Sequence, residues 1–198
     1  MVSVRQERAD LSFGMCEWGR ARSRALPTDS IGTAMIKIRV MTAEDVEAVS
    51  RFLAGSWRQT YGPLLGEDVT ARIFSERHAP ERFAAELADT SKTSLVAEQD
   101  GSIRGYTMSH ADSGGGVMID RLHVDTRLFG SGLAADMLAA ICQVHDGAQS
   151  IGLKVIQGND RALAFCRKQG FVVVERRPAS LGVDGHYAII MRKHLKPG

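Results

Sequence analysis

The chain has 198 residues, of which 44% are hydrophobic and 24% are charged, and its formal net charge is +2. This length suits one domain, and the composition is that of an ordinary soluble globular protein. The mild charge, without a dense Lys/Arg stripe, argues against a nucleic-acid partner. The apolar runs are far shorter than the ~20 residues that cross a bilayer, so we expect no membrane partner either.

Three scattered cysteines, Cys16, Cys142 and Cys166, form no Cys-x-x-Cys pair. Their odd number favours a reduced, cytoplasmic setting over a disulfide framework. Cys142 and His145 lie three residues apart on an expected helix. Two ligands do not make a zinc site, so we expect no metal.

Residues 1–34 differ from the rest because they carry no sustained hydrophobic period. They lack the apolar central region of a secretory signal, and their acidic residues count against an organelle presequence. We interpret them as a flexible or poorly packed N-terminal leader, followed by one domain over residues 35–198. Translation from Met35 is a live alternative, because the ordered pattern begins there.

The ordered pattern begins with a strand over residues 36–41. Thr42 and Asp45 then form a capping-box-like helix start, with Asp in place of the preferred Glu or Gln. Apolar residues follow at helical spacing: Val46, Val49, Leu53 and Trp57. We expect the pair Gly62-Pro63 to end this helix. Two shorter helices follow, over residues 68–75 and 80–89, the second with Pro in its first turn.

The second half of the chain alternates strands and helices. A hairpin around Asp100-Gly101 joins the first two strands. Asn159 caps the second helix, and Gly170 ends it. The predicted strands span residues 94–99, 103–110, 117–124, 151–157, 171–176 and 186–192, and the predicted helices span residues 131–145 and 160–169. Hairpins mixed with crossover helices imply a mixed α/β sheet rather than a purely parallel one.

The most informative segment runs from the strand over residues 117–124 through Gly130-Ser131-Gly132 into a helix. A helix start exposes backbone N–H donors and the positive end of the peptide dipole array, so such a turn can cradle an anion. A P-loop would need Gly-Lys-Ser/Thr, but Leu133 and Ala134 follow Gly132. This turn is therefore not a P-loop.

A Rossmann fingerprint is a second reading of the turn, because Gly130-x-Gly132-x-x-Ala135 fits its pattern as written. The first glycine of that fingerprint should come directly after the strand, but residues 125–129 intervene. The next strand should end in an acidic residue, and here it ends in Gln157. The Rossmann reading is therefore weak.

Two sequence blocks carry a resemblance to a known family. The first is Leu122-His123-Val124-Asp125 followed by Gly130-Ser131-Gly132-Leu133-Ala134. The second is Asn159-x-x-Ala162-x-x-Phe165-Cys166-x-x-x-Gly170-Phe171. In this order, joined by a helix and a strand, they resemble the acetyl-CoA loop and the downstream motif of the GCN5-related N-acetyltransferases, the GNAT family. The resemblance covers about residues 36–195. It implies an α/β (α+β) fold, with a mixed, mostly antiparallel twisted sheet of about six to seven strands flanked by helices.

The resemblance also implies a binding site for acetyl-CoA as co-substrate. Backbone N–H groups across residues 129–134 would hold the pyrophosphate, while the strand end at residues 122–124 splays from the next strand and holds the pantetheine arm. The same strand N–H groups would polarise the thioester carbonyl. Asn159 either reaches the cofactor or only caps its helix. The implied cofactor-binding residues are Leu122, His123, Val124, Phe129, Gly130, Ser131, Gly132, Leu133, Ala134 and Asn159.

Three positions depart from the family pattern. Phe129 stands where Gln or Arg is usual, and Ser131 where a basic residue is common, so fewer charges face the phosphates; Arg127 could compensate. Cys166 stands where many members carry a tyrosine proposed as general acid. Cys166 could donate a proton or sit near the CoA thiol, or it could be a small buried apolar residue. The departing CoA thiolate needs little help, because a free thiol has a pKa near ~8.5.

A primary amine arrives mostly protonated, so a base or water chain must remove a proton before attack. Asp120 is the best candidate, because alternation places it on the same strand face as Leu122 and Val124. The alternative is a solvated carboxylate or a partner for Arg121 or Arg39. His123 should point to the opposite face as a packed histidine. Weaker candidates lie near predicted strand ends: His110, Asp112, His186 and Tyr187.

Trp57 and Tyr61, four residues apart, fall where the family builds its acceptor pocket. Their segment, Trp-x-x-Thr-Tyr-x-x-Leu-Leu, resembles a subset of bacterial members with varied acceptors, some of them polyamines. Aromatic residues at this spacing often simply pack into the core. The nearby acidic residues could attract a cationic amine or be merely solvated: Glu67, Asp68 and Glu76.

These observations predict an N-acetyltransferase that moves an acetyl group from acetyl-CoA to a small primary amine. The amine should attack directly in a ternary complex, without an acyl-enzyme on Cys166. Two alternatives stay open: a non-catalytic acyl-CoA-binding sensor or partner-binding module, and an acetyltransferase for protein N-termini or lysines. A homodimer is left open as well.

Overall fold

The computed structural model describes residues 35–181 and 184–195, where seven strands form one sheet. The strand order is β1-β2-β3-β4-β5-β7-β6, and every neighbouring pair is antiparallel except β4 and β5. The strands are β1 (Lys37–Val40), β2 (Lys92–Gln99), β3 (Ser102–Ala111), β4 (Val117–Val124), β5 (Ser150–Ile156), β6 (Val172–Pro178) and β7 (Tyr187–His194). The expected mixed, mostly antiparallel sheet is confirmed; the predicted leader lies outside the described residues.

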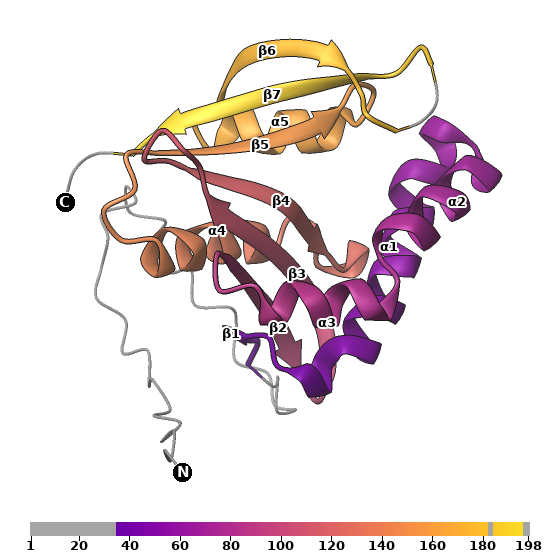
Figure 1. Cartoon of the computed structure of the whole chain (residues 1–198), viewed down its shortest axis with the longest axis vertical. Helices are drawn as coiled ribbons and strands as arrows, with labels where there is room; N and C mark the ends of the chain where they lie inside the picture. Colours follow the sequence, from indigo (N-terminus) through magenta and orange to yellow (C-terminus); the bar gives the residue numbers. More distant parts are fainter. Residues whose placement is uncertain (1–34, 182–183, 196–198) are drawn as a thin grey trace. The chain divides into compact units, whose positions relative to one another are not determined.

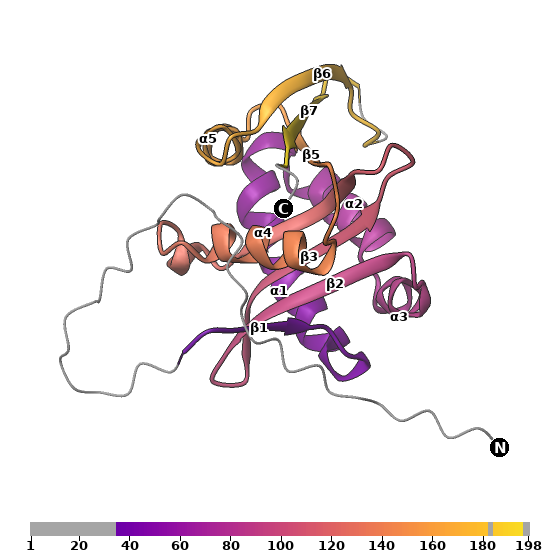
Figure 2. The ribbon, with the colours of Figure 1, turned by 90° about the vertical axis from the view of Figure 1, so that its left-hand side faces the viewer.

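In the described part of the chain, five α-helices flank the sheet: α1 (Val46–Leu65), α2 (Glu67–Arg77), α3 (Pro80–Ala88), α4 (Leu133–Val144) and α5 (Asp160–Lys168). Figures 1 and 2 show α1 and α4 on opposite faces of the strands. On one face, Val49 and Leu53 of α1 pack against Tyr106. On the other, Leu133 and Met137 of α4 pack against β2 and β4. Both faces of the central strands are therefore buried.

The last helix, α5, covers β5 and β7 on the α4 side of the sheet. Its residues Leu163 and Cys166 share one buried cluster with Leu138 of α4 and Leu153 of β5. This packing fixes α5 beside β5 (Figure 1). The α4 and α5 helices therefore stand on one face, while α1, α2 and α3 belong to the other.

The first helix ends later than the sequence predicts. Gly62-Pro63 does not end α1, which continues through Pro63 to Leu65. Proline this close to the C-terminus deletes only one backbone hydrogen bond, and the last turn is held by buried Leu65, which clusters with Trp57 and Ile73. The helix ends at Gly66, where a φ of +82° turns the chain and its N–H donates to the Gly62 carbonyl.

The start of α1 is fixed by the carboxylate of Asp45. Its Oδ2 accepts the Thr42 backbone N–H at 2.8 Å, which confirms the capping-box-like start. Its two oxygens also accept both terminal nitrogens of Arg39, at 2.7 and 2.8 Å, and Arg39 bonds Glu98 of β2 as well. The Arg39 guanidinium lowers the pKa of Asp45 to about 2. Asp45 and Arg39 together thus tie β1, β2 and the start of α1 to one another.

None of the helices within residues 35–181 and 184–195 has the combined length and hydropathy of a membrane span.

Replacing Asp45 tests this tie. Because its folded-state pKa lies below the ordinary 3.8, the ionised carboxylate stabilises the fold above about pH 4, and this stability is lost as the pH falls toward 2. We expect Asp45→Asn to lower the free energy of unfolding at pH 7 by about 2 kcal/mol, with a difference from wild type that narrows below pH 4. Urea titrations of the wild type and the variant, repeated from pH 7 down to pH 3, measure this difference in the free energy of unfolding.

The control is Glu175→Gln, which removes the carboxylate of an exposed ion pair with Arg177 (3.8 Å) and should change stability little. A loss for Asp45→Asn that stays constant from pH 7 to pH 3 would contradict the assignment.

Candidate functional site

The central feature of the site is the point where β4 and β5 separate. The two parallel strands pair only at Val117–Ile151, Met118–Gly152 and Ile119–Leu153. Beyond Ile119 they diverge toward α1 (Figure 1), while β4 keeps its pairing with β3 up to Val124. The splayed strand end that the resemblance implies is therefore present. Within residues 35–181 and 184–195, no strand pairs with the backbone of β4 on this side beyond Ile119.

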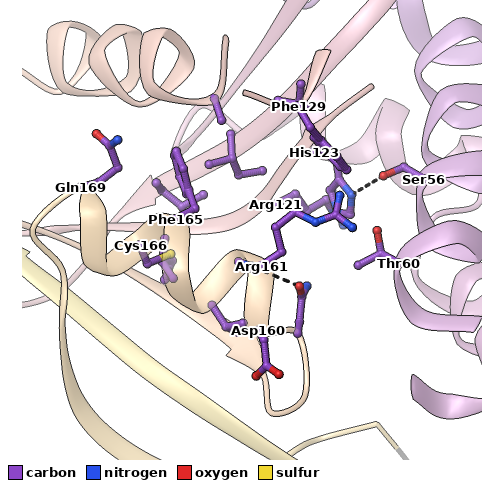
Figure 3. Close-up of a pocket in the computed structure, with 18 of the residues that line it drawn as sticks. Ser56, Thr60, Arg121, His123, Phe129, Asp160, Arg161, Phe165, Cys166 and Gln169 are labelled. Atoms are coloured by element: carbon purple, nitrogen blue, oxygen red, sulfur yellow. Dashed lines mark hydrogen bonds between the residues drawn. The ribbon is translucent and has the colours of Figure 1, made fainter. Parts of the chain in front are cut away.

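A groove of about 660 Å³ follows this separation, a size typical of small-molecule sites. Residues Leu122, His123 and Val124 of β4 line it, together with the turn before α4, the start of α5 and one side of α1. Figure 3 shows α5 residues on one side of the groove and Ser56 and Thr60 of α1 on the other. We call it the strand-end groove.

The glycine turn presents backbone donors to the strand-end groove. Gly130 and Gly132 adopt φ values of +82° and +101°, which a side chain would strain. Phe129 and Ser131 donate their N–H groups to Thr126 and Leu128 carbonyls. No acceptor within the described residues takes the N–H groups of Gly130, Gly132 and Ala134. These three donors stand at the start of α4, where the helix dipole favours an anion.

Two arginines near this turn have different surroundings. Arg127, the predicted compensating cation, binds Asp125 through two nitrogens at 3.0 and 2.6 Å and does not line the groove. Arg161 of α5 does line it, and its guanidinium lies 4.0 Å above the half-exposed ring of Phe129. The aromatic ring at position 129 therefore positions a cation beside the turn, through a cation–π contact from another helix.

Asn159 and Cys166 line the groove but have evident structural roles. The Asn159 side chain accepts the Ala162 N–H at 3.2 Å, so it caps α5. Cys166 is 2% exposed and packs in the core cluster of α4, α5 and β5. Burial raises the pKa of its thiol to about 11. These features favour the packing interpretation of Cys166, because the thiolate needed for nucleophilic attack is disfavoured.

A β-bulge in β4 corrects one predicted orientation. Met108 pairs with Arg121 while Ser109 pairs with Ile119, so Asp120 is an extra residue. The α4 side is occupied by Ile119 before the bulge and by Leu122 after it. Asp120 instead lies with Arg121 on the α1–α3 side. Our expectation that Asp120 shares a face with Leu122 and Val124 was wrong, because the extra residue interrupts the alternation.

Asp120 also has different partners from those considered. Its Oδ2 lies 3.0 Å from His110 Nδ1, and its Oδ1 lies 4.0 Å from Lys154 Nζ. Arg121 instead forms a two-nitrogen ion pair with Glu86 of α3. Arg39 is bound to Asp45 and Glu98. Asp120 is therefore free of strong arginine pairing.

A second cavity of about 460 Å³ meets the groove at this bulge. We call it the basic pocket. Five residues line both cavities: Tyr61, Asp120, Arg121, His123 and Lys154. Two ligands, one in each cavity, would therefore come together at these residues.

His123 faces this junction from β4, as predicted on the side opposite Leu122. Its Nδ1 lies 2.9 Å from the Ser56 hydroxyl of α1 (Figure 3). Burial, with the nearby Arg121 charge, lowers the pKa of His123 to about 4. The imidazole is therefore neutral at pH 7 and a weak base.

The aromatic residues of α1 form a wall of the basic pocket. Trp57 is 9% exposed, and its ring lies 4.5 Å from Tyr61 and 4.8 Å from His78, centroid to centroid. Trp57 belongs to a core cluster and also lines the basic pocket, whereas Tyr61 lines both cavities. Core packing and pocket lining thus coincide for this pair.

The weaker candidates lie outside both cavities. His110 contacts Asp120 at 3.0 Å, and Asp112 binds Arg192 at 2.8 Å. The ring of Tyr187 stacks under Arg176. His145, considered above with Cys142, hydrogen-bonds Ser109 through Nε2 at 3.0 Å. Within the described residues no group of three His, Cys, Asp or Glu side chains is placed to hold a metal ion.

The comparisons with known proteins agree with this geometry. Residues 57–171 match the model of the acetyltransferase (GNAT) family. Curated relatives described as uncharacterised N-acetyltransferases, from Mycobacterium bovis and Mycobacterium tuberculosis, are 26% identical over 153 residues; the match covers 76% of this chain and 98% of each relative.

Solved structures share the fold. The PaiA N-acetyltransferase of Thermoplasma acidophilum, solved in complex with coenzyme A, has a TM-score of 0.72 and 21% identity over 81% of this chain and 99% of that one. A GCN5-related N-acetyltransferase of Rhodopseudomonas palustris has a TM-score of 0.67 and 21% identity over 84% of this chain and 100% of that one.

Proposed function

Because the chain belongs to the GNAT family of acetyltransferases, we propose that it moves an acetyl group from acetyl-CoA to a primary amine, with a small-molecule amine as acceptor. One observation carries the proposal: the strands β4 and β5 separate directly beside a turn with three N–H donors that have no acceptor in the described part of the chain. The coenzyme A bound to the similar Thermoplasma acidophilum protein supports the choice of coenzyme. We also propose a cytoplasmic location, from the cysteine usage.

The coenzyme would lie along the strand-end groove. Its diphosphate would accept hydrogen bonds from the N–H groups of Gly130, Gly132 and Ala134. Its pantetheine arm would run beside the unpaired edge of β4, as an added strand does. The thioester would then reach the junction of the two cavities, where backbone N–H groups of β4 can stabilise the developing oxyanion.

The chemistry would be direct attack. The amine nitrogen adds to the thioester carbonyl, the tetrahedral intermediate collapses, and the C–S bond breaks to release the CoA thiolate. We propose that Asp120, at the junction, takes up the proton that the amine gives up, directly or through water. The high pKa of Cys166 disfavours both an acyl-cysteine and proton donation to the thiolate.

A steady-state assay tests the function. The protein with acetyl-CoA should release free CoA thiol only when a primary amine is present. Direct attack predicts intersecting initial-velocity lines and no acetyl label on Cys166; parallel lines or a trapped label would contradict it. Calorimetric binding of acetyl-CoA without amine-dependent thiol release would instead support a sensor. Activity confined to peptide N-termini or lysines would support a protein acetyltransferase.

The role of the backbone donors is tested at Ala134, the second residue of α4. Proline is tolerated in the first helical turn, so Ala134→Pro removes one unpaired N–H with little effect on the helix. We expect about tenfold weaker acetyl-CoA binding, because a charge-assisted hydrogen bond is lost. Calorimetry measures the affinity, and a thermal melt checks the fold. Ala134→Ser, which keeps the N–H, is the control; equal affinities for both variants would exclude the contact.

The two arginines offer a matched comparison of side-chain charge. We expect Arg161→Gln to weaken acetyl-CoA binding about fivefold, with a smaller salt dependence, because its guanidinium stands over Phe129 at the groove. Arg127→Gln should change the affinity little, because Asp125 already neutralises Arg127. A larger effect at Arg127 than at Arg161 in calorimetry would reverse the assignment.

A further inference from the structure

The basic pocket collects cationic side chains from six elements of the fold. They come from α2, α3, β2, β4, β5 and β6: Arg77, Arg82, Lys92, Arg121, Lys154 and Arg177. Among the described residues, two carboxylates line the same cavity, Glu86 and Asp120. The cavity where the acceptor would lie is therefore lined by more positive than negative side chains.

Ion pairing neutralises only part of this charge. Arg121 is bound to Glu86, and Lys154 lies 4.0 Å from Asp120. Lys92 and Arg177 pair with Asp89 and Glu175, two carboxylates that do not line the pocket. Six basic side chains thus face four carboxylates.

Two of the six arginine and lysine side chains have no carboxylate partner within the described residues. The Arg77 guanidinium donates to the backbone carbonyl of Ser180, and Arg82 forms no ion pair there. Both project from the helices that border the pocket, α2 and α3. They leave an excess positive charge available to a ligand.

Two buried histidines respond to the same environment. Burial, together with the charges of Arg121, His123, Arg77 and Arg82, lowers the pKa of His78 to about 3. His123 at the junction is also neutral at pH 7. The pocket therefore disfavours an added positive charge.

The acidic residues that could have attracted a cationic amine are elsewhere. Glu67, Asp68 and Glu76 of α2 are exposed and line neither cavity. Glu76 pairs with Arg72 on the helix surface. Of the two alternatives considered for these carboxylates, their placement favours simple solvation over attraction of a cationic amine.

We propose that the acceptor amine carries a carboxylate, which Arg77 and Arg82 of the basic pocket bind while the amino group reaches the junction with the groove. The proposal rests on the acetyl transfer proposed above. Arginine presents paired donors that match a carboxylate, and positive surroundings steer an anion into a cleft. The same charges lower the pKa of the amine and so increase its neutral, nucleophilic fraction. An amino acid fits a pocket of about 460 Å³.

Matched acceptors test the proposal. Initial rates of thiol release are measured with a set of free L-amino acids, their carboxamides and spermidine. We expect kcat/KM for the best amino acid to exceed that for its carboxamide at least tenfold, because the amide keeps the size but loses the charge. Phosphoethanolamine and ethanolamine form a second pair, which separates a carboxylate preference from a general preference for anions.

A charge-removing variant tests the residues. Arg82→Gln should raise KM for the amino acid about tenfold, with a smaller change for the carboxamide and none in the KM for acetyl-CoA. Arg72→Gln on the exposed face of α2 removes the same charge outside both cavities and should behave as wild type.

The outcomes are distinct. Turnover that favours spermidine or the carboxamides overturns this inference and leaves the acetyl transfer standing, as does a preference for phosphoethanolamine over every amino acid. No turnover with any amine overturns both. Equal effects of Arg82→Gln on amino acid and carboxamide would remove the assigned role of Arg82, and with it this inference.

Discussion

The separation of β4 from β5 is the constraint on which the rest of this structure depends. A central strand normally satisfies backbone groups on both edges, and burying them unpaired costs free energy. Here β4 keeps both partners for three residues and then only β3. The open edge persists because α1 and α5 stand on either side of it and form the walls of the groove. An extended ligand with its own amide groups is the natural partner of such an edge.

Much of the fold could be predicted from local patterns. Hydrophobic periods indicated all seven strands and the long helices, and the hairpin at Asp100-Gly101 followed from its turn residues. The end of α1 was misjudged, because Gly62-Pro63 is a strong local signal for a break. What outweighs it is tertiary: buried Leu65 holds the last turn in a cluster with Leu181, more than a hundred residues later. No local rule includes such a contact.

The site was only partly predictable for the same reason. The glycine turn and its helix form one continuous segment, so sequence spacing alone indicated an anion cradle. Two contacts of the site join residues from separate elements: Arg161 with Phe129, and Ser56 with His123. No periodicity in the sequence predicts such contacts. The basic pocket is the extreme case. Its six cationic residues come from six elements, and the sequence around each one predicts only an ordinary solvated side chain.

The extra residue in β4 places two consecutive side chains, Asp120 and Arg121, on the same side of the strand. On one face of β4, hydrophobic side chains pack into the core under α4. On the other face, Arg121 and His123 border the junction beside Asp120. Deleting Asp120 would restore regular alternation and leave Arg121 on the same side of the strand, but it would remove the carboxylate from the junction. The irregularity thus brings a carboxylate and a guanidinium together at the point where the two cavities meet.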